Sequence, residues 1–297
     1  MTLRIAMIGL GDIARKAYLP VLGPRPDLAL TFVTRDAETL AELGAAWRVD
    51  RLHTALDAAL AEGLDGAFVH AATAAHPAIV RRLLEAGVPT MVDKPLADTA
   101  AESGVLVDLA ETRGVSLMVG FNRRHAPVYR EAAALALPLV VIQKNRAGPL
   151  DAVRRAVFDD YIHVVDTLRF FAPGADQVAV RGQARDGRLE HVMLSLSGGG
   201  HDAIGIMNRA SGASEETLEV SGHGMKRRIV DLDQVVDLGG AEALIRRGNW
   251  TSVGRQRGFE ALCDTFLSAV RDGRRLSAQD TLETHRLCET VVGALTA

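Results

Sequence analysis

The first 121 residues alternate between short, continuous apolar runs and longer segments with apolar residues at helical spacing. The runs predict strands at residues 3–8, 28–33, 66–70, 90–92 and 116–121. The segments between them predict helices at residues 12–22, 54–62, 77–86 and 100–113. Strands that are apolar throughout are typical of a parallel sheet covered by helices on both faces. We therefore predict an α/β region with a doubly wound parallel sheet.

The pattern changes after Arg123. Helices are predicted at residues 127–137 and 161–171, with a strand at residues 139–143 between them. Short alternating runs, broken by turn residues such as Asp186-Gly187, fill residues 177–238 and predict antiparallel hairpins. Two helices close the chain at residues 259–271 and 278–295. This half is predicted to be an α+β domain with an open, mostly antiparallel sheet.

Composition narrows the class of protein. The net charge of −3 gives no electrostatic reason to expect nucleic acid or an anionic membrane as a partner. The two cysteines, Cys263 and Cys288, are expected to be buried free thiols, which favours a reducing compartment. A strand pattern begins directly at the N-terminus, and no apolar stretch has the length of a membrane span. We expect a cytoplasmic protein.

A glycine fingerprint follows the first predicted strand. Gly9-Leu10-Gly11-Asp12-Ile13-Ala14 fits G-x-G-x-x-A between a strand and a helix. The first glycine permits a tight turn, the second lets the backbone approach a pyrophosphate, and the helix N-terminus offers N–H groups to it. The turn predicts a dinucleotide site that includes Gly9, Gly11, Asp12 and Ile13; a turn that serves only packing is the alternative.

The end of the second strand bears on which dinucleotide binds. An acidic residue there would bind the ribose diol of NAD. The chain has Thr34 and Arg35 instead, and a guanidinium can pair with the 2′-phosphate of NADP. Asp36 is better explained as the N-cap of the next helix than as a ribose ligand. We predict NADP as the cofactor, with NAD as the alternative.

A lysine follows the strand at residues 90–92. Asp93-Lys94-Pro95 places an ammonium group where that strand ends, and ligands of such sheets bind beyond the carboxyl ends of the strands. Lys94 is therefore positioned to reach the reacting carbon of a substrate beside a nicotinamide. Asp93 is expected to bind cofactor or substrate hydroxyls, or to pair with Lys94.

Taken together, four segments resemble the Gfo/Idh/MocA oxidoreductase family: the glycine fingerprint, residues 93–95, residues 120–124 and Asp159-Asp160-Tyr161-Ile162-His163. Residues 68–76 and 160–166 resemble the bacterial MviM-like subfamily in particular. The resemblance covers essentially the whole chain. It implies a Rossmann dinucleotide-binding domain at residues 1–122 and a substrate-binding and oligomerisation domain at residues 123–297, whose closing helices pack back on the first. A homodimer is expected by the same analogy.

Two positions depart from the family's usual pattern. Asp93 stands where the family usually has glutamate, and Tyr161 stands where it has glycine two positions before the histidine. The Tyr161 phenol is expected to narrow the substrate pocket or to donate a hydrogen bond into it.

The resemblance implies catalytic roles for Lys94, His163 and Asp159. His163 is the natural acid/base because an imidazole titrates near neutral pH. Lys94 stabilises negative charge on the substrate oxygen and is the alternative proton donor. Asp159 lies four residues before His163 and would share a helix face with it, orienting the imidazole or holding a substrate hydroxyl.

Further candidates surround the same predicted crevice. Thr73 and His76 follow the strand at residues 66–70 as cofactor ligands, although His76 is also suited to capping the next helix. Asn122 is assigned to the cofactor and Arg123 to the substrate, because both follow the strand at residues 116–121. Arg124 fits either an anionic substrate or a surface ion pair, and Asn208-Arg209 is a weaker substrate candidate.

No metal site is predicted, because neither paired histidines nor Cys-x-x-Cys occurs. The function we predict is NADP-dependent hydride transfer to or from a small polar carbonyl or hydroxyl compound, sugar-like in character. Three alternatives stay open: a permanently bound, recycled cofactor that enables elimination or glycosidic cleavage, a catalytically silent dinucleotide sensor, and reduction of an imine or natural product.

Overall fold

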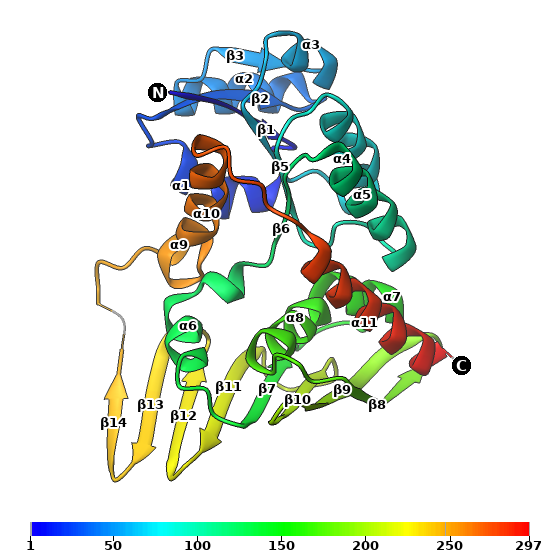
Figure 1. Cartoon of the computed structure of the whole chain (residues 1–297), viewed down its shortest axis with the longest axis vertical. Coiled ribbons are helices and arrows are strands. Elements are labelled where there is room, and N and C mark those ends of the chain that lie inside the picture. Colours follow the sequence, from blue (N-terminus) through cyan, green and yellow to red (C-terminus); the bar gives the residue numbers. More distant parts are fainter. Residues whose placement is uncertain (1, 247, 297) are drawn as a thin grey trace. The chain divides into compact units, whose positions relative to one another are not determined.

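The computed structural model describes residues 2–246 and 248–296 and divides the chain into two compact units. Unit 1 comprises residues up to Gly120 together with Phe259–Leu282, and unit 2 comprises Phe121–Gly258 with the residues from Glu283 onward. Each unit is built around one sheet (Figure 1). The predicted pairing of a parallel α/β sheet with a second, mostly antiparallel sheet is confirmed.

Unit 1 holds a six-stranded parallel sheet in the order β3-β2-β1-β4-β5-β6. Its strands are β1 (Leu3–Ile8), β2 (Leu28–Val33), β3 (Arg51–His53), β4 (Gly66–Val69), β5 (Thr90–Asp93) and β6 (Leu117–Gly120). Its helices are η1 (Ala14–Tyr18), α1 (Leu19–Leu22), α2 (Ala37–Trp47), α3 (Leu56–Ala61), η2 (Thr73–Ala75), α4 (His76–Glu85), α5 (Ala100–Arg113) and α10 (Phe259–Arg271). The strand order reverses beside β1, so the carboxyl ends of β1 and β4 flank the topological switch point.

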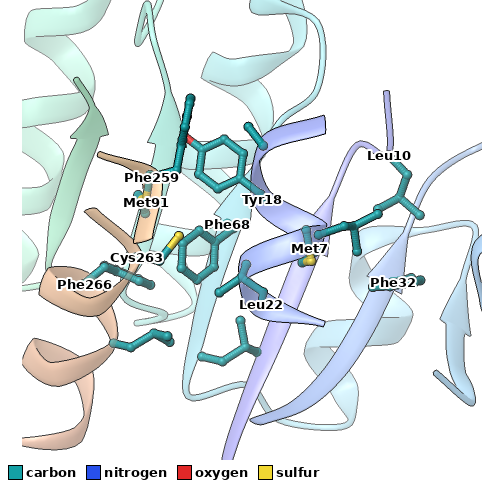
Figure 2. Close-up of a cluster of buried hydrophobic side chains, with 14 of the residues drawn as sticks. Met7, Leu10, Tyr18, Leu22, Phe32, Phe68, Met91, Phe259, Cys263 and Phe266 are labelled. Carbon is teal, nitrogen blue, oxygen red and sulfur yellow. The ribbon is translucent and has the colours of Figure 1, made fainter. Parts of the chain in front are cut away.

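The core of unit 1 joins the two ends of its sequence (Figure 2). The ring of Phe266 on α10 meets the ring of Phe68 on β4 edge-on, with centroids 5.0 Å apart. Phe259 meets Tyr18 in the same way at 5.2 Å. Burying such side chains contributes roughly 1.5–3 kcal/mol each. Side chains of α10 therefore complete the hydrophobic core of unit 1.

Unit 2 holds an eight-stranded sheet in the order β14-β13-β12-β11-β7-β10-β9-β8, in which β7 and β10 pair in parallel and the other neighbours are antiparallel. Its strands are β7 (Leu139–Asn145), β8 (Gln177–Arg185), β9 (Arg188–Gly198), β10 (His201–Asn208), β11 (Glu215–Gly222), β12 (Met225–Val230), β13 (Gln234–Gly239) and β14 (Ala241–Ile245). The remaining helices are η3 (Asn122–His125), α6 (Pro127–Ala133), α7 (Val153–Ala156), η4 (Val157–Tyr161), α8 (Ile162–Phe171), α9 (Val253–Gln256) and α11 (Gln279–Thr296), the last of which begins in unit 1.

Helix α8 covers the middle of this sheet and packs on β7, β9 and β10. It approaches closely because position 205 in β10 is glycine: a Cβ there would lie 2.5 Å from Val164 Cγ1. Side chains along β7 alternate between the face covered by α8 and the opposite face. Val140 and Ile142 are buried beneath the helices, whereas Val141 and Gln143 on the opposite face are only half-buried.

Candidate functional site

The carboxyl ends of four neighbouring strands, β1, β4, β5 and β6, form one edge of the sheet in unit 1. Gly9 follows β1, His70 follows β4, Asp93 ends β5 and Gly120 ends β6. The glycine fingerprint and Asp93-Lys94 therefore lie at the same edge, where parallel sheets bind ligands.

The turn after β1 has the geometry that a dinucleotide requires. Gly9 has φ +82°, and a Cβ there would lie 2.4 Å from the backbone nitrogen of Ala71, so only glycine fits. A Cβ at Gly11 would meet no described atom within 4 Å. Asp12 and Ile13 are exposed in the first turn of the helix that follows. The turn thus leaves space above backbone N–H groups at a helix start, which suits a pyrophosphate.

The end of β2 presents an exposed cation. Asp36 is confirmed as the N-cap of α2, because its Oδ1 accepts hydrogen bonds from the backbone N–H groups of Glu38 at 3.0 Å and Thr39 at 3.3 Å. Arg35 is exposed and Thr34 half-buried just before it. Asp36 is thus engaged by α2, whereas the adjacent side chain of Arg35 is exposed.

His76 is buried, and its ring lies between the loops that follow β4 and β5. Its Nδ1 lies 2.9 Å from the carbonyl oxygen of Pro95, and its Nε2 lies 2.8 Å from that of Ala71. The expectation that His76 binds the cofactor needs correction, because both ring nitrogens face backbone carbonyls. The ring instead connects the loop after β4 to the loop that carries Lys94. Thr73, three residues earlier in η2, is half-buried.

Asp93, which directly precedes Lys94, belongs to a polar cluster with Tyr18 and His70. The hydroxyl of Tyr18 donates a hydrogen bond of 2.9 Å to Oδ1 of Asp93, and the ring of Tyr18 stacks on His70 with centroids 3.9 Å apart. Burial raises the pKa of Asp93, although Lys94 and Tyr18 act in the opposite direction. Burial also lowers the pKa of His70 to about 3, so this imidazole is neutral at physiological pH. Tyr18 and His70 were not predicted as site residues; they are marked only by their places after the glycine turn and after β4.

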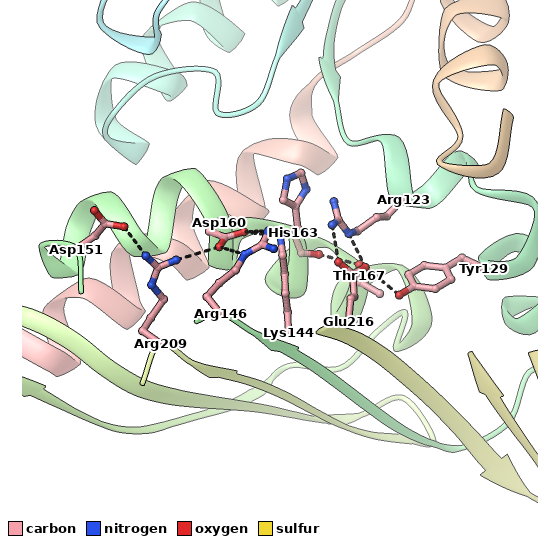
Figure 3. A network of polar contacts seen from close by, with 10 residues as sticks. All are labelled: Arg123, Tyr129, Lys144, Arg146, Asp151, Asp160, His163, Thr167, Arg209 and Glu216. Carbon is pink, nitrogen blue, oxygen red and sulfur yellow. Dashed lines mark hydrogen bonds and ion pairs between the residues drawn. The ribbon is translucent and has the colours of Figure 1, made fainter. Parts of the chain in front are cut away.

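In unit 2, His163 lies in the first turn of α8 and is half-buried (Figure 3). Asp159 is exposed in the preceding π-helical segment η4, and its Oδ2 lies 3.4 Å from Nε of Arg155. The π-helical turn between the two residues replaces the regular α-helical spacing that was expected to place them on one face.

The expectation that the Tyr161 hydroxyl contacts substrate needs correction, because the hydroxyl is engaged within unit 2. Its side chain is fully buried, and its hydroxyl donates a hydrogen bond of 2.7 Å to the carbonyl oxygen of Gly205 in β10. Burial raises the pKa of this phenol, which stays protonated. The residue that replaces the family's glycine therefore anchors the helix to the sheet.

Asn122 and Arg123 follow β6 but bind other parts of unit 2. The side-chain amide of Asn122 donates to the carbonyl oxygen of Arg257 at 2.8 Å. Arg123 is buried against Glu216, with Nε–Oε1 and Nη2–Oε2 distances of 2.7 and 2.5 Å. The assignment of Arg123 to substrate needs this correction, because Glu216 occupies two of its donors.

Arg124 and Arg209 are also held by ion pairs. Nη2 of Arg124 lies 2.7 Å from Oδ1 of the buried Asp166. Arg209 contacts Asp151 at 2.5 Å and Asp160 at 3.3 Å. Both residues thus form ion pairs within unit 2 (Figure 3 shows those of Arg209).

Lys144, which was not predicted as a site residue, lies between the ion pairs of Asp160 and Glu216 (Figure 3). It is buried on β7, forms an ion pair with Asp160, and is directly opposite Glu216 in the register of β7 and β11. Burial and the neighbouring Arg123 lower the pKa of Lys144 to about 7. The only local signal was the polar run Lys144-Asn145-Arg146 that ends an apolar strand.

Residues 2–246 and 248–296 contain no group of three or more histidine, cysteine or acidic residues able to hold a metal ion. Among the helices of these residues, none combines the length and the apolar character that crossing a bilayer demands. Cys263 and Cys288 are buried free thiols, as predicted.

Comparison with known families places two matches along the chain. A family described as "Oxidoreductase family, NAD-binding Rossmann fold" matches residues 3–121. A second, described as "YceM-like, C-terminal domain", matches residues 127–237.

Curated relatives give the same picture. The chain is 34% identical over 280 residues to the putative oxidoreductase YceM of Salmonella typhimurium. The aligned region covers 91% of this chain and 90% of YceM. It is 34% identical over 167 residues to the myo-inositol dehydrogenase Hyg17 of Streptomyces leeuwenhoekii, covering 56% of this chain and about half (49%) of Hyg17.

Two solved structures are similar over the full length. A Gfo/Idh/MocA family oxidoreductase from Vibrio cholerae is 31% identical and has a TM-score of 0.93, with 100% of both chains covered. The dehydrogenase MviM from Clostridium difficile is 28% identical with a TM-score of 0.92, covering 99% of this chain and 100% of that chain.

Proposed function

Because the chain belongs to the Gfo/Idh/MocA oxidoreductase family and is similar to its MviM-like members, we propose that it is an NADP-dependent oxidoreductase of sugar-like compounds. The observation that carries this proposal is at the carboxyl edge of the sheet in unit 1. There, the turn at Gly9, which only glycine can form, follows β1. β4 is the next strand of the sheet, and β5 is the one after it, ending at Asp93 directly before Lys94. This order brings a phosphate-binding turn and a lysine to one ligand-binding edge.

NADP is favoured over NAD by the end of β2. The exposed guanidinium of Arg35 suits a 2′-phosphate, which is bidentate and doubly charged. The carboxylate that could accept hydrogen bonds from a ribose diol, Asp36, caps α2 instead. Thr34 offers only a hydroxyl at this position.

The substrate is proposed to be a polyhydroxylated compound with one carbon oxidised or reduced. Nicotinamide supplies or accepts the hydride when it is bound. Lys94 would stabilise the negative charge that develops on the reacting oxygen, since an ammonium is favourable where an alkoxide forms. His163 would take or return the hydroxyl proton, and Asp159 would orient a substrate hydroxyl. The same edge of unit 1 is proposed to hold the cofactor through Gly9, Gly11, Thr73 and Asp93.

A homodimer through the uncovered face of the unit 2 sheet is part of the proposal. Val141, Met193, Ile204 and Ile206 alternate with buried positions and are half-exposed on that face. Contiguous apolar residues on a sheet face that no helix covers favour association with a second copy. The two free thiols favour a cytoplasmic location.

The experiment that tests the proposed function uses the purified full-length chain. Fluorescence titration with NADPH and NADH measures cofactor preference, and nicotinamide absorbance follows turnover with myo-inositol, UDP-N-acetylglucosamine and a panel of aldoses and sugar acids. We expect tighter binding of NADPH and turnover of at least one polyol or sugar. Absence of binding for both dinucleotides would overturn the proposal.

A further inference from the structure

The short π-helical segment η4 ends two residues before His163 and is bound to the sheet of unit 2 at two consecutive residues, Asp160 and Tyr161 (Figure 3 shows the contact of Asp160). π-Helical turns are rare, appear mostly as single turns within α-helices and are frequent at functional sites. Such a turn forms fewer favourable contacts than an α-helix, so surrounding interactions must hold it. The two ties at Asp160 and Tyr161 are those interactions.

Asp160 is surrounded by three cations from the sheet. Lys144 on β7 forms an ion pair with its Oδ1, Nε of Arg146 lies 2.8 Å from its Oδ2, and Nη1 of Arg209 lies 3.3 Å from the same oxygen. Burial on its own would raise the pKa of Asp160, but Lys144 and Arg146 outweigh burial and hold this pKa well below its usual range. The carboxylate is therefore charged at every physiological pH.

Lys144 is the most buried of these three cations. Its amine is flanked by Asp160 from η4, Glu216 from β11, Arg123 from η3 and Arg146, which directly follows β7. These neighbours carry two negative and two positive charges, so the ammonium gains little from them in sum. Burial and the repulsion from Arg123 lower the pKa of Lys144 to about 7. The amine is thus charged only in part near neutral pH.

The second tie fixes the next residue. Tyr161 is fully buried and its hydroxyl donates to the Gly205 carbonyl oxygen at 2.7 Å. Tyr161 and Asp160 are thus bound to the neighbouring strands β10 and β7, directly before α8 begins at Ile162. The carbonyl oxygen of His163 is in turn bound by the hydroxyl of Thr167 at 2.7 Å, which holds this first turn of α8 together.

We propose that Lys144 is a positioning residue for His163: by holding Asp160, it fixes the π-helical turn and thereby the direction and surroundings of the imidazole. The inference deepens the proposed function, since it assigns a further residue to the same acid/base. It also implies that the positioning weakens as pH rises through about 7, because Asp160 then loses one of its three cations. Arg146 and Arg209 keep their charges and preserve the fold.

Histidine NMR on isotope-labelled protein tests the proposal directly. The His163 ring signals among the nine histidines are assigned from their loss in H163Q. We expect K144M to shift these signals at neutral pH and D160N to shift them in the same direction. K144R, whose charge does not titrate, should restore the wild-type signals below pH 7 and abolish the inflection that Lys144 adds to their pH dependence. D160N keeps the test available if K144M does not fold.

Lys226 provides the matched control, because it also pairs with an acid on the same sheet, Glu219 at 2.6 Å, but is half-exposed. K226M should leave the His163 signals unchanged. Unchanged His163 signals in both K144M and D160N, or equal shifts in K226M, would overturn the proposal. The measurement needs neither cofactor nor substrate, so a protein that binds no dinucleotide would refute the proposed function while leaving this result interpretable.

Discussion

The hydroxyl of Tyr18 donates a hydrogen bond to Asp93, although the two residues are 75 positions apart in the sequence. Tyr18 lies in the helix that follows the glycine turn, and Asp93 ends β5 directly before Lys94. The helix that would bind the pyrophosphate thus also fixes the carboxyl next to the lysine. This hydrogen bond therefore links the helix after the glycine turn to the end of β5, next to Lys94, within unit 1.

Replacing Tyr18 with phenylalanine tests this link. Y18F removes one buried hydrogen bond, which costs about 0.5–1.5 kcal/mol plus the cost of a less satisfied Asp93. We expect turnover to fall while NADPH affinity changes little. Y129F is the matched control, because Tyr129 is equally buried and donates to a different carboxylate, that of Glu216, at 3.0 Å. Equal losses of turnover in both variants, measured beside their melting temperatures, would argue against a specific role for Tyr18.

His76 is predicted to hold the loop that carries Lys94. H76A removes both carbonyl contacts, at Pro95 and Ala71, and should destabilise the protein by about 1–3 kcal/mol. Amide hydrogen exchange should accelerate at Leu96 and Ala97, which are buried in this loop. The exposed His191 supplies a control variant, H191A, with no expected change. Unaltered exchange at residues 96–97 in H76A would show that the ring does not hold the loop.

Arg35 is predicted to select the cofactor. R35A removes the charge expected to pair with the 2′-phosphate, so the affinity for NADPH should fall about 10-fold or more, as loss of a charge-assisted hydrogen bond implies. NADH affinity should stay nearly constant, since NADH lacks that phosphate. Fluorescence titration with both dinucleotides measures the ratio, and equal weakening of the two would remove Arg35 from the phosphate site.

The buried pair of Arg123 and Glu216 predicts an acid-dependent part of the stability. Burial alone would raise the pKa of Glu216, but Arg123 and Lys144 lower it from 4.5 to about 2. A carboxyl with a lowered pKa in the folded state stabilises the protein above pH 4.5 and loses that contribution as pH falls toward about 2. E216Q should cost about 3–5 kcal/mol at neutral pH, because Arg123 is left buried without its counter-charge.

Urea unfolding of wild type and E216Q across pH measures this contribution. The difference between their free energies of unfolding should shrink as pH falls below 4.5. A difference that is constant from neutral to acid pH would mean that Glu216 is not the titrating partner.

His163 is predicted to act as the acid/base of hydride transfer. H163A should lower kcat by about 10²–10⁴-fold with little effect on NADPH binding, because general acid–base catalysis contributes factors of that size. The pH profile of kcat/KM in wild type should also lose one limb in the variant. A minor change in kcat would instead assign the acid/base role to Lys94.

Features set by neighbouring residues could be predicted from the sequence, because their cause is local. The turn at Gly9, the cap formed by Asp36 and the strand that ends at Asp93 each depend on a few consecutive residues. β3 was not predicted, since Arg51–His53 is a three-residue strand without an apolar run. β14 was not predicted either, because Ala241–Ile245 is exposed along its whole length.

The side-chain environment of the site was less predictable, since it depends on residues far apart. Lys144 becomes a buried amine only because Asp160 and Glu216 reach it from other elements. Tyr161 donates to Gly205 from a π-helical segment, and the helical spacing in the sequence gave no sign of that segment. His76 was expected at the cofactor, but its two ring nitrogens lie against two backbone carbonyl oxygens, those of Pro95 and Ala71, that only the folded loops bring together.

A crystal structure of the full-length chain with NADPH tests the central claim most directly. The account predicts that Nζ of Lys94 and the imidazole of His163 both lie within hydrogen-bonding distance of one water or substrate oxygen beside nicotinamide C4, with Arg35 at the 2′-phosphate. A complex in which Lys94 and His163 face separate cavities, or in which the dinucleotide binds away from the Gly9–Gly11 turn, would contradict it.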